Sequence, residues 1–139
     1  MSIEREIMDD ANVRIVARAS MSSLVKLVHS LNAKWWFDIQ TGEPLNRNVG
    51  EMLMLVVSEL SEAMEGHRKN LMDDKLPHRP MIEVEIGDAI IRLLDMAGGL
   101  KVNGKPLDVP GAIVEKLVYN STREDHSREH RLSEHGKKY

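Results

Sequence analysis

The chain has 139 residues, no cysteine and a net charge of −3 at pH 7. This length predicts one domain over residues 1–139, with a polar C-terminal tail from about residue 124. The small net charge provides no general attraction to nucleic acid or to an anionic membrane. No apolar run approaches the roughly 18 residues of a membrane span, and the first residues lack the plan of a signal peptide. We therefore expect a cytoplasmic protein that binds neither nucleic acid nor membrane, and any metal must be bound by oxygen or imidazole.

The first predicted helix covers about residues 10–33, where apolar residues recur at helical spacing with basic residues between them. It is followed by the chain's aromatic cluster, Lys34-Trp35-Trp36-Phe37, and by a turn-rich link through Gly42 and Pro44. The cluster has two interpretations. These rings could fill the core, or they could form a flat pocket on which a nucleobase stacks.

Two further helices follow, and both are unusually apolar. Asn48 with Glu51 resembles a capping box, which predicts a second helix from there to at least residue 65. Pro80 suits the first turn of a third helix, expected at about residues 81–97. The run at residues 52–57 is apolar all round, as is typical of a buried helix. Together these helices are apolar on more faces than a small monomer can cover, so we expect a partner chain to cover the rest.

Four carboxylates interrupt these two apolar helices in matched pairs. Glu59 and Glu62 are three residues apart, as are Glu85 and Asp88, so each pair shares one helical face. At 100° per residue these acids are predicted to point inward, where unpaired carboxylates cost several kcal/mol each. One solution is that Arg or Lys pairs with them across the helix interface. The other is a hard divalent cation, above all magnesium, bound by four converging oxygen donors.

The remaining pattern is a turn and a fourth helix. Asp95 lies two turns after Asp88 on the same face, where it could extend the acidic cluster or pair with a base. Residues 103–106 predict a turn, such as the tip of a small hairpin, and Pro110 opens a helix over about residues 111–123. On that helix Lys116, Asn120 and Arg123 recur at helical spacing, with Tyr119 adjacent. This cationic face is either an ordinary solvated surface or a phosphate-binding one.

These segments together resemble the MazG family of all-α nucleoside triphosphate pyrophosphohydrolases, especially its short, phage-type single-domain members. The resemblance covers about residues 45–138. It rests on the motifs Ser58-Glu59-Leu60-Ser61-Glu62 and Glu85-Ile86-Gly87-Asp88, on residues 115–123, and on the closing Gly136-Lys137-Lys138. Many members carry a third acid at the position of Ser58, and others have only the four core acids.

The resemblance implies a four-helix bundle that forms a homodimer or homotetramer, with substrate between subunits. It also implies magnesium, or manganese as an alternative, bound by Glu59, Glu62, Glu85 and Asp88. The expected reaction is hydrolysis of a nucleoside triphosphate between its α and β phosphates. The expected catalytic residues are Glu59, which would also orient the attacking water, and Lys116 and Arg123, which would stabilise the departing pyrophosphate. The candidate substrate-binding residues are Lys116, Tyr119, Asn120, Arg123, Trp36 and His29.

Two other functions fit the same sequence. A phosphoribosyl-ATP pyrophosphohydrolase shares the superfamily and its acid pattern. A catalytically silent helical interaction module would instead pair its acids with bases across a dimer.

Overall fold

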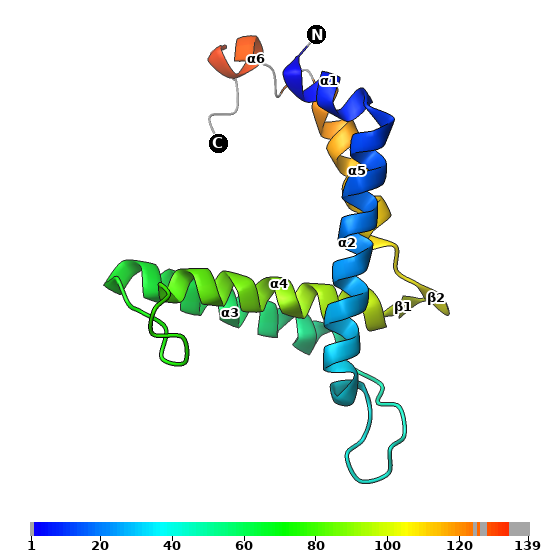
Figure 1. The fold of residues 1–139 in the computed structure, drawn as a ribbon, viewed down its shortest axis with the longest axis vertical. Helices are drawn as coiled ribbons and strands as arrows, with labels where there is room; N and C mark the ends of the chain where they lie inside the picture. Colours follow the sequence, from blue (N-terminus) through cyan, green and yellow to red (C-terminus); the bar gives the residue numbers. More distant parts are fainter. Residues whose placement is uncertain (1, 124, 126–127, 134–139) are drawn as a thin grey trace. The chain divides into compact units, whose positions relative to one another are not determined.

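The computed structural model describes residues 2–123, 125 and 128–133. Its elements are, in chain order, α1 (Ile3–Asp9), α2 (Ala11–Asn32), the 3-10 helix η1 (Ala33–Trp36), α3 (Val49–Lys69), α4 (Met81–Gly99), β1 (Lys101–Val102), β2 (Lys105–Pro106), α5 (Val109–Ser121) and α6 (Arg128–Leu132) (Figure 1). Helices dominate the described chain, and the two strands form one short antiparallel hairpin. The all-α class is therefore confirmed.

The chain divides into two compact units, which are described separately. One unit contains residues 24–107, and the other contains residues 1–23 together with residues 108–139. Helix α2 contributes its C-terminal part to the first of these and its N-terminal part to the second. That residues 1–139 form one domain stays a prediction.

The unit of residues 24–107 is built on α3 and α4, which lie side by side (Figure 1). The buried residues of α3 alternate at spacings of four and three, which places them in one stripe along the helix; they are Met52, Val56, Glu59, Ala63 and Gly66. Met52, Val56, Ala89 and Met96 form the hydrophobic core, with Trp36 and Leu100 packed against it. Gly66 permits a close approach, since an added Cβ would lie 2.9 Å from the Cβ of Met81.

Local sequence signals explain where these helices begin and end. The Asn48 side chain accepts a hydrogen bond from the Glu51 amide at 3.2 Å, which confirms the predicted N-cap of α3. At the other end Asn70 adopts the left-handed conformation with φ of 52°, so α3 ends at Lys69 and Gly66 is interior. Helix α4 runs two residues beyond the predicted end. The hairpin turn at Asn103 and Gly104 is also confirmed.

In the second unit, α1 packs against α5. Asp108 caps α5 by accepting the Gly111 amide at 3.0 Å, and it also pairs with Arg18 at 2.6 Å. Helix α1 was not predicted. Helix α5 ends at Ser121, so Arg123 lies beyond it rather than on it. The predicted tail contains α6, while residues 124, 126–127 and 134–139 lie outside the described residues.

Within this chain α3 is not buried all round, as expected of a helix with more apolar faces than one small chain can cover. A second stripe of α3 is exposed, at residues spaced four, three and four apart: Leu53, Val57, Leu60 and Met64. Helix α4 has a matching exposed stripe of Ile86, Ile90 and Leu93. One packing partner covers one face of a helix, and in this unit α3 and α4 each use one face on the other.

None of the helices in the described part of the chain combines the length and apolar character needed to span a bilayer.

Candidate metal centre

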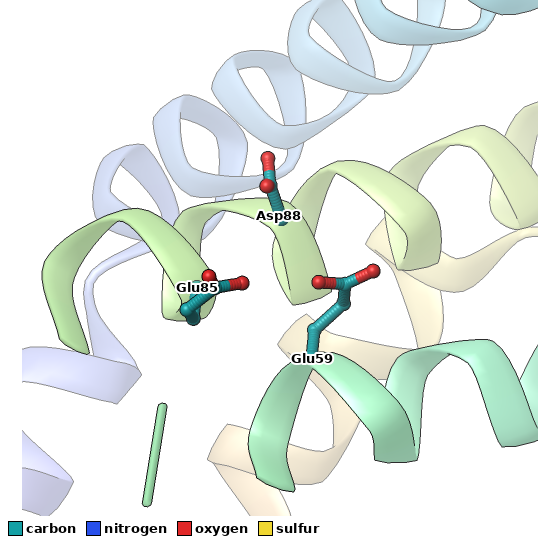
Figure 2. A group of neighbouring side chains, drawn as sticks. All are labelled: Glu59, Glu85 and Asp88. Carbon is teal, nitrogen blue, oxygen red and sulfur yellow. The ribbon is translucent and has the colours of Figure 1, made fainter. Parts of the chain in front are cut away.

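Three of the four predicted acidic residues meet between α3 and α4. Glu59 projects from α3, and Glu85 and Asp88 project from α4 (Figure 2). One carboxylate oxygen from each lies within 4.8 Å of the other two. Two ligands on opposite sides of one cation lie about 4.2 Å apart on Mg²⁺ and about 4.8 Å apart on Ca²⁺. The oxygen donors and their spacing therefore fit a hard divalent cation after small side-chain rotations.

The cluster is only partly buried. Glu59 and Glu85 are each 7% exposed and occupy core positions of their helices, as expected. Glu62 and Asp88 are exposed, so the prediction that all four acids point inward is wrong for these two. Residues three apart on a helix differ by about 60° in direction, so the second member of each pair falls at the edge of the buried stripe. Asp88 still joins the cluster, whereas the role of Glu62 as a metal ligand stays a prediction.

Negative charge accumulates at Glu85. Burial of its carboxyl, a hydrogen bond with Glu59, and the charges of Glu62, Glu59 and Asp88 together raise the pKa of Glu85 to about 7. A carboxyl group in this environment favours its protonated form until a positive charge arrives. A cation at this position would relieve the repulsion among the carboxylates.

One positive charge already contacts the cluster. The Nε of Arg92 on α4 donates to the Oε1 of Glu59 on α3 at 2.6 Å. This is the pairing of acid and base across the helix interface that the sequence left open as an alternative. It applies to Glu59, one of three carboxylates in the cluster.

A cavity of about 500 Å³ lies beside the cluster, within the unit of residues 24–107. Its polar lining comes from both acids and bases, and its apolar lining from α3, α4 and the aromatic cluster; the residues are Asn32, Trp35, Arg47, Met52, Leu55, Asp88, Ile91, Arg92, Asp95 and Met96. Asp88 belongs to both the acidic cluster and the cavity wall. A ligand in the cavity would therefore reach the cluster through Asp88.

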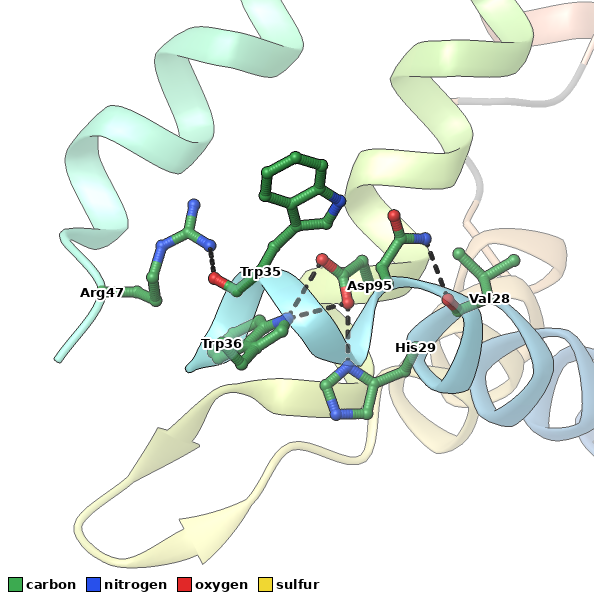
Figure 3. Close-up of polar contacts among 7 residues, drawn as sticks. Val28, His29, Trp35, Trp36, Arg47 and Asp95 are labelled. Carbon is green, nitrogen blue, oxygen red and sulfur yellow. Dashed lines mark hydrogen bonds and ion pairs between the residues drawn. The ribbon is translucent and has the colours of Figure 1, made fainter. Parts of the chain in front are cut away.

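Asp95 forms hydrogen bonds with two of the predicted substrate-binding residues, Trp36 and His29. Its carboxylate accepts the Trp36 Nε1–H, with distances of 2.9 and 3.1 Å to its two oxygens, and lies 2.8 Å from the Nδ1 of His29 (Figure 3). The two rings meet edge to face at 5.4 Å. Of the two alternatives for Asp95, pairing with a base is the one observed. Trp36 packs against the core, and the neighbouring Trp35, 60% exposed, lines the cavity.

The predicted phosphate-binding residues belong to the other unit. Lys116 Nζ lies 4.5 Å from the Tyr119 ring centroid, and the Arg123 guanidinium lies 5.9 Å from it. Arg123 also forms a two-bonded ion pair with Asp125, which raises the pKa of Arg123. Asn120 is half-buried. Their approach to the carboxylates stays a prediction.

Among the cavity residues, sequence reasoning missed Arg47 and the role of Asp95 as acceptor for Trp36, whereas it placed Trp35 in the aromatic cluster that could form a pocket. Arg92 had a recognisable signal, since it lies one helical turn after Asp88 inside an otherwise apolar stretch. Arg47 had none, because it comes from the long link before α3. Its guanidinium donates to the Trp35 carbonyl at 2.5 Å and lies 5.6 Å from the Trp36 ring centroid (Figure 3).

Comparisons with protein-family models, with curated proteins and with solved structures each found no match for this chain.

Proposed function

We propose that this protein is a magnesium-dependent nucleoside triphosphate pyrophosphohydrolase of the MazG-like type. The observation that carries the proposal is the convergence of Glu59, Glu85 and Asp88 from two helices, with oxygens within 4.8 Å of one another, beside a cavity. A cavity of about 500 Å³ is of the size that binds small ligands. Carboxylate oxygens are the donors that magnesium prefers.

The chemistry divides between the acids and the bases. A bound magnesium ion would supply Lewis acidity toward phosphoryl oxygens and lower the pKa of a coordinated water. Glu59, the buried acid of α3, would orient that water. Lys116 and Arg123 would stabilise negative charge on the departing pyrophosphate, and Asn120 would orient it. No covalent intermediate is required.

The exposed stripes of α3 and α4 support a homodimer or homotetramer. Stripes of three or four large apolar residues on adjacent helices are typical of surfaces that a second chain covers. Pairing them with a second copy would complete the four-helix bundle implied by the family resemblance. Substrate would then bind between subunits.

The ion pair between Arg92 and Glu59 favours a second candidate function. If Glu59 is buried only to form this ion pair, the protein is a helical interaction module without catalysis. Such a module has no reason to bind magnesium. An ion pair to a buried acid such as Glu59 can fix how two helices associate.

Two measurements decide between these functions. Isothermal titration with magnesium should show binding by the wild-type protein and none by Glu59→Gln. A screen of canonical and damaged nucleoside triphosphates should then yield a monophosphate and pyrophosphate from at least one of them. Absence of magnesium binding would refute the enzymatic proposal. A separate kinetic test is Lys116→Ala, which should lower the turnover number if Lys116 acts on the leaving group.

A further inference from the structure

Arg92 is placed to serve two partners. It lies on α4 one helical turn after Asp88 and one turn before Asp95, and all three side chains line the cavity. Its guanidinium contacts Glu59 at 2.6 Å, yet its side chain remains 41% exposed. The group therefore lies at the boundary between the acidic cluster and the cavity, with part of its side chain open to solvent.

Two other charged groups of the cavity wall, Asp95 and Arg47, are already engaged. Asp95 is bonded to His29 and Trp36, and Arg47 is bonded to the Trp35 carbonyl. Arg92 differs because its partner, Glu59, belongs to the carboxylate cluster that fits a divalent cation. A guanidinium and a divalent cation compete for the same Glu59 carboxylate, since each is attracted to the carboxylate and repelled by the other at such short range.

We propose that a divalent cation bound to the acidic cluster displaces the guanidinium of Arg92 from Glu59, and that the freed guanidinium binds a phosphate group of the ligand in the cavity. This inference rests on the proposed function and adds to it a phosphate-binding residue within the unit that holds the acids. A planar guanidinium donates two parallel hydrogen bonds to phosphate oxygens, which a Lys ammonium cannot do.

The transfer of Arg92 from Glu59 to a phosphate group predicts a coupling between the two binding affinities. Because the cation releases Arg92 and the phosphate group captures it, magnesium and a phosphate ligand should each increase the affinity for the other. Part of that coupling is direct contact between the ion and the phosphate oxygens. The part due to Arg92 is what a substitution at this residue removes.

The test uses the full chain, with magnesium and inorganic pyrophosphate as probes in isothermal titration. In Arg92→Gln, the affinity for pyrophosphate at saturating magnesium should fall about tenfold or more, the effect of losing a hydrogen bond to a charged group. The affinity for magnesium alone should increase, because a competing cation is gone. The matched control is Arg79→Gln, which removes an Arg–Glu ion pair of the same unit that does not line the cavity. It should change neither affinity.

The outcomes separate this inference from the proposed function. Unchanged pyrophosphate affinity in Arg92→Gln would overturn the inference while leaving magnesium binding intact. A fall in magnesium affinity as large as the fall in pyrophosphate affinity would also overturn it, since Arg92 would then only support the site. If the wild-type protein binds no magnesium, the proposed function fails and the inference fails with it. Should Arg92→Gln not fold, Arg92→Lys replaces it: a several-fold loss for pyrophosphate alone supports the inference, and unchanged affinity refutes it.

Discussion

The guanidinium of Arg92 lies 2.6 Å from the buried carboxylate of Glu59, so one acid of the cluster has a counter-ion on the facing helix. This pair compensates part of the cost of burying Glu59. The remaining carboxylates, Glu85 and Asp88, each place an oxygen within 4.8 Å of one on Glu59.

The first prediction concerns heat stability with and without magnesium. Magnesium should raise the melting temperature of the wild-type protein, because a ligand that binds only the folded state stabilises it. Glu59→Gln and Asp88→Asn should remove this increase and abolish turnover while the circular dichroism spectrum stays helical. The control is Asp74→Asn, an exposed loop substitution that should retain the increase. Near-normal turnover of either cluster variant at saturating magnesium would contradict the metal assignment.

The second prediction concerns pH. In the presence of a chelator, the pKa of Glu85 is about 7 in the folded protein against an ordinary value of 4.5. The folded state therefore binds more protons than the unfolded state between these values, so the free energy of unfolding falls as pH rises from 4.5 to about 7, by a few kcal/mol at most. Urea unfolding at several pH values measures this decrease in the free energy of unfolding.

Glu85→Gln should flatten that slope, because it removes the titrating group. The difference between variant and wild type isolates Glu85 from other acids, such as Asp38 and Glu65, whose pKa values are lowered. Glu83→Gln is the control, since Glu83 is exposed in the first turn of the same helix. Parallel slopes in wild type and Glu85→Gln would show that this carboxyl group does not titrate as expected.

The third prediction concerns Asp95. Asp95→Ala should reduce the free energy of unfolding by about 1–3 kcal/mol, because the Trp36 N–H and the His29 ring lose a charged acceptor in a partly buried setting. Tryptophan fluorescence should change as well. Asp95→Asn keeps one acceptor oxygen and should lose less. Equal stability of wild type and Asp95→Ala would mean that water replaces the lost acceptor at no cost.

The fourth prediction compares two glycines of α4. An added Cβ at Gly99 would overlap the Trp36 indole, whereas one at Gly87 meets nothing within 4 Å. Gly99→Ala should destabilise the protein by about 1–3 kcal/mol through overpacking. Gly87→Ala should stabilise it by about 0.5–1 kcal/mol, because alanine is the better helix former. Chemical denaturation of both variants measures the contrast, and stabilisation by Gly99→Ala would contradict the close packing.

The fifth prediction concerns assembly. Light scattering at micromolar concentration should show a dimer or tetramer, because association would bury the exposed apolar stripes of α3 and α4. Leu60→Lys, at a position 50% exposed in the middle of the α3 stripe, should shift the equilibrium toward the monomer. Ile39→Lys should not, since Ile39 is 98% exposed and lies outside both helices. A fully active wild-type monomer would show that these stripes serve another purpose.

The sequence alone determined the main helices, the start of α3 and the pairing of the acids. Apolar periodicity fixed α2, α3 and α4 to within a few residues, and Asn48 marked the start of α3 because a capping side chain acts on its own neighbours. Spacing placed Glu59 with Glu62 and Glu85 with Asp88, since 100° per residue is a property of the helix itself. All of these are local relations within about two helical turns.

Only the tertiary structure decided which acids are buried, which base meets them and which tryptophan faces the cavity. Periodicity gives the angles between residues of one helix but not the rotation of that helix against its neighbour. That rotation buried Glu59 and Glu85, and it left Glu62 and Asp88 at the edge. The Arg92–Glu59 contact joins residues 33 positions apart, and adjacent residues of a 3-10 helix differ by about 120°, so Trp35 and Trp36 point in different directions. Such relations depend on packing between helices, which no local pattern specifies.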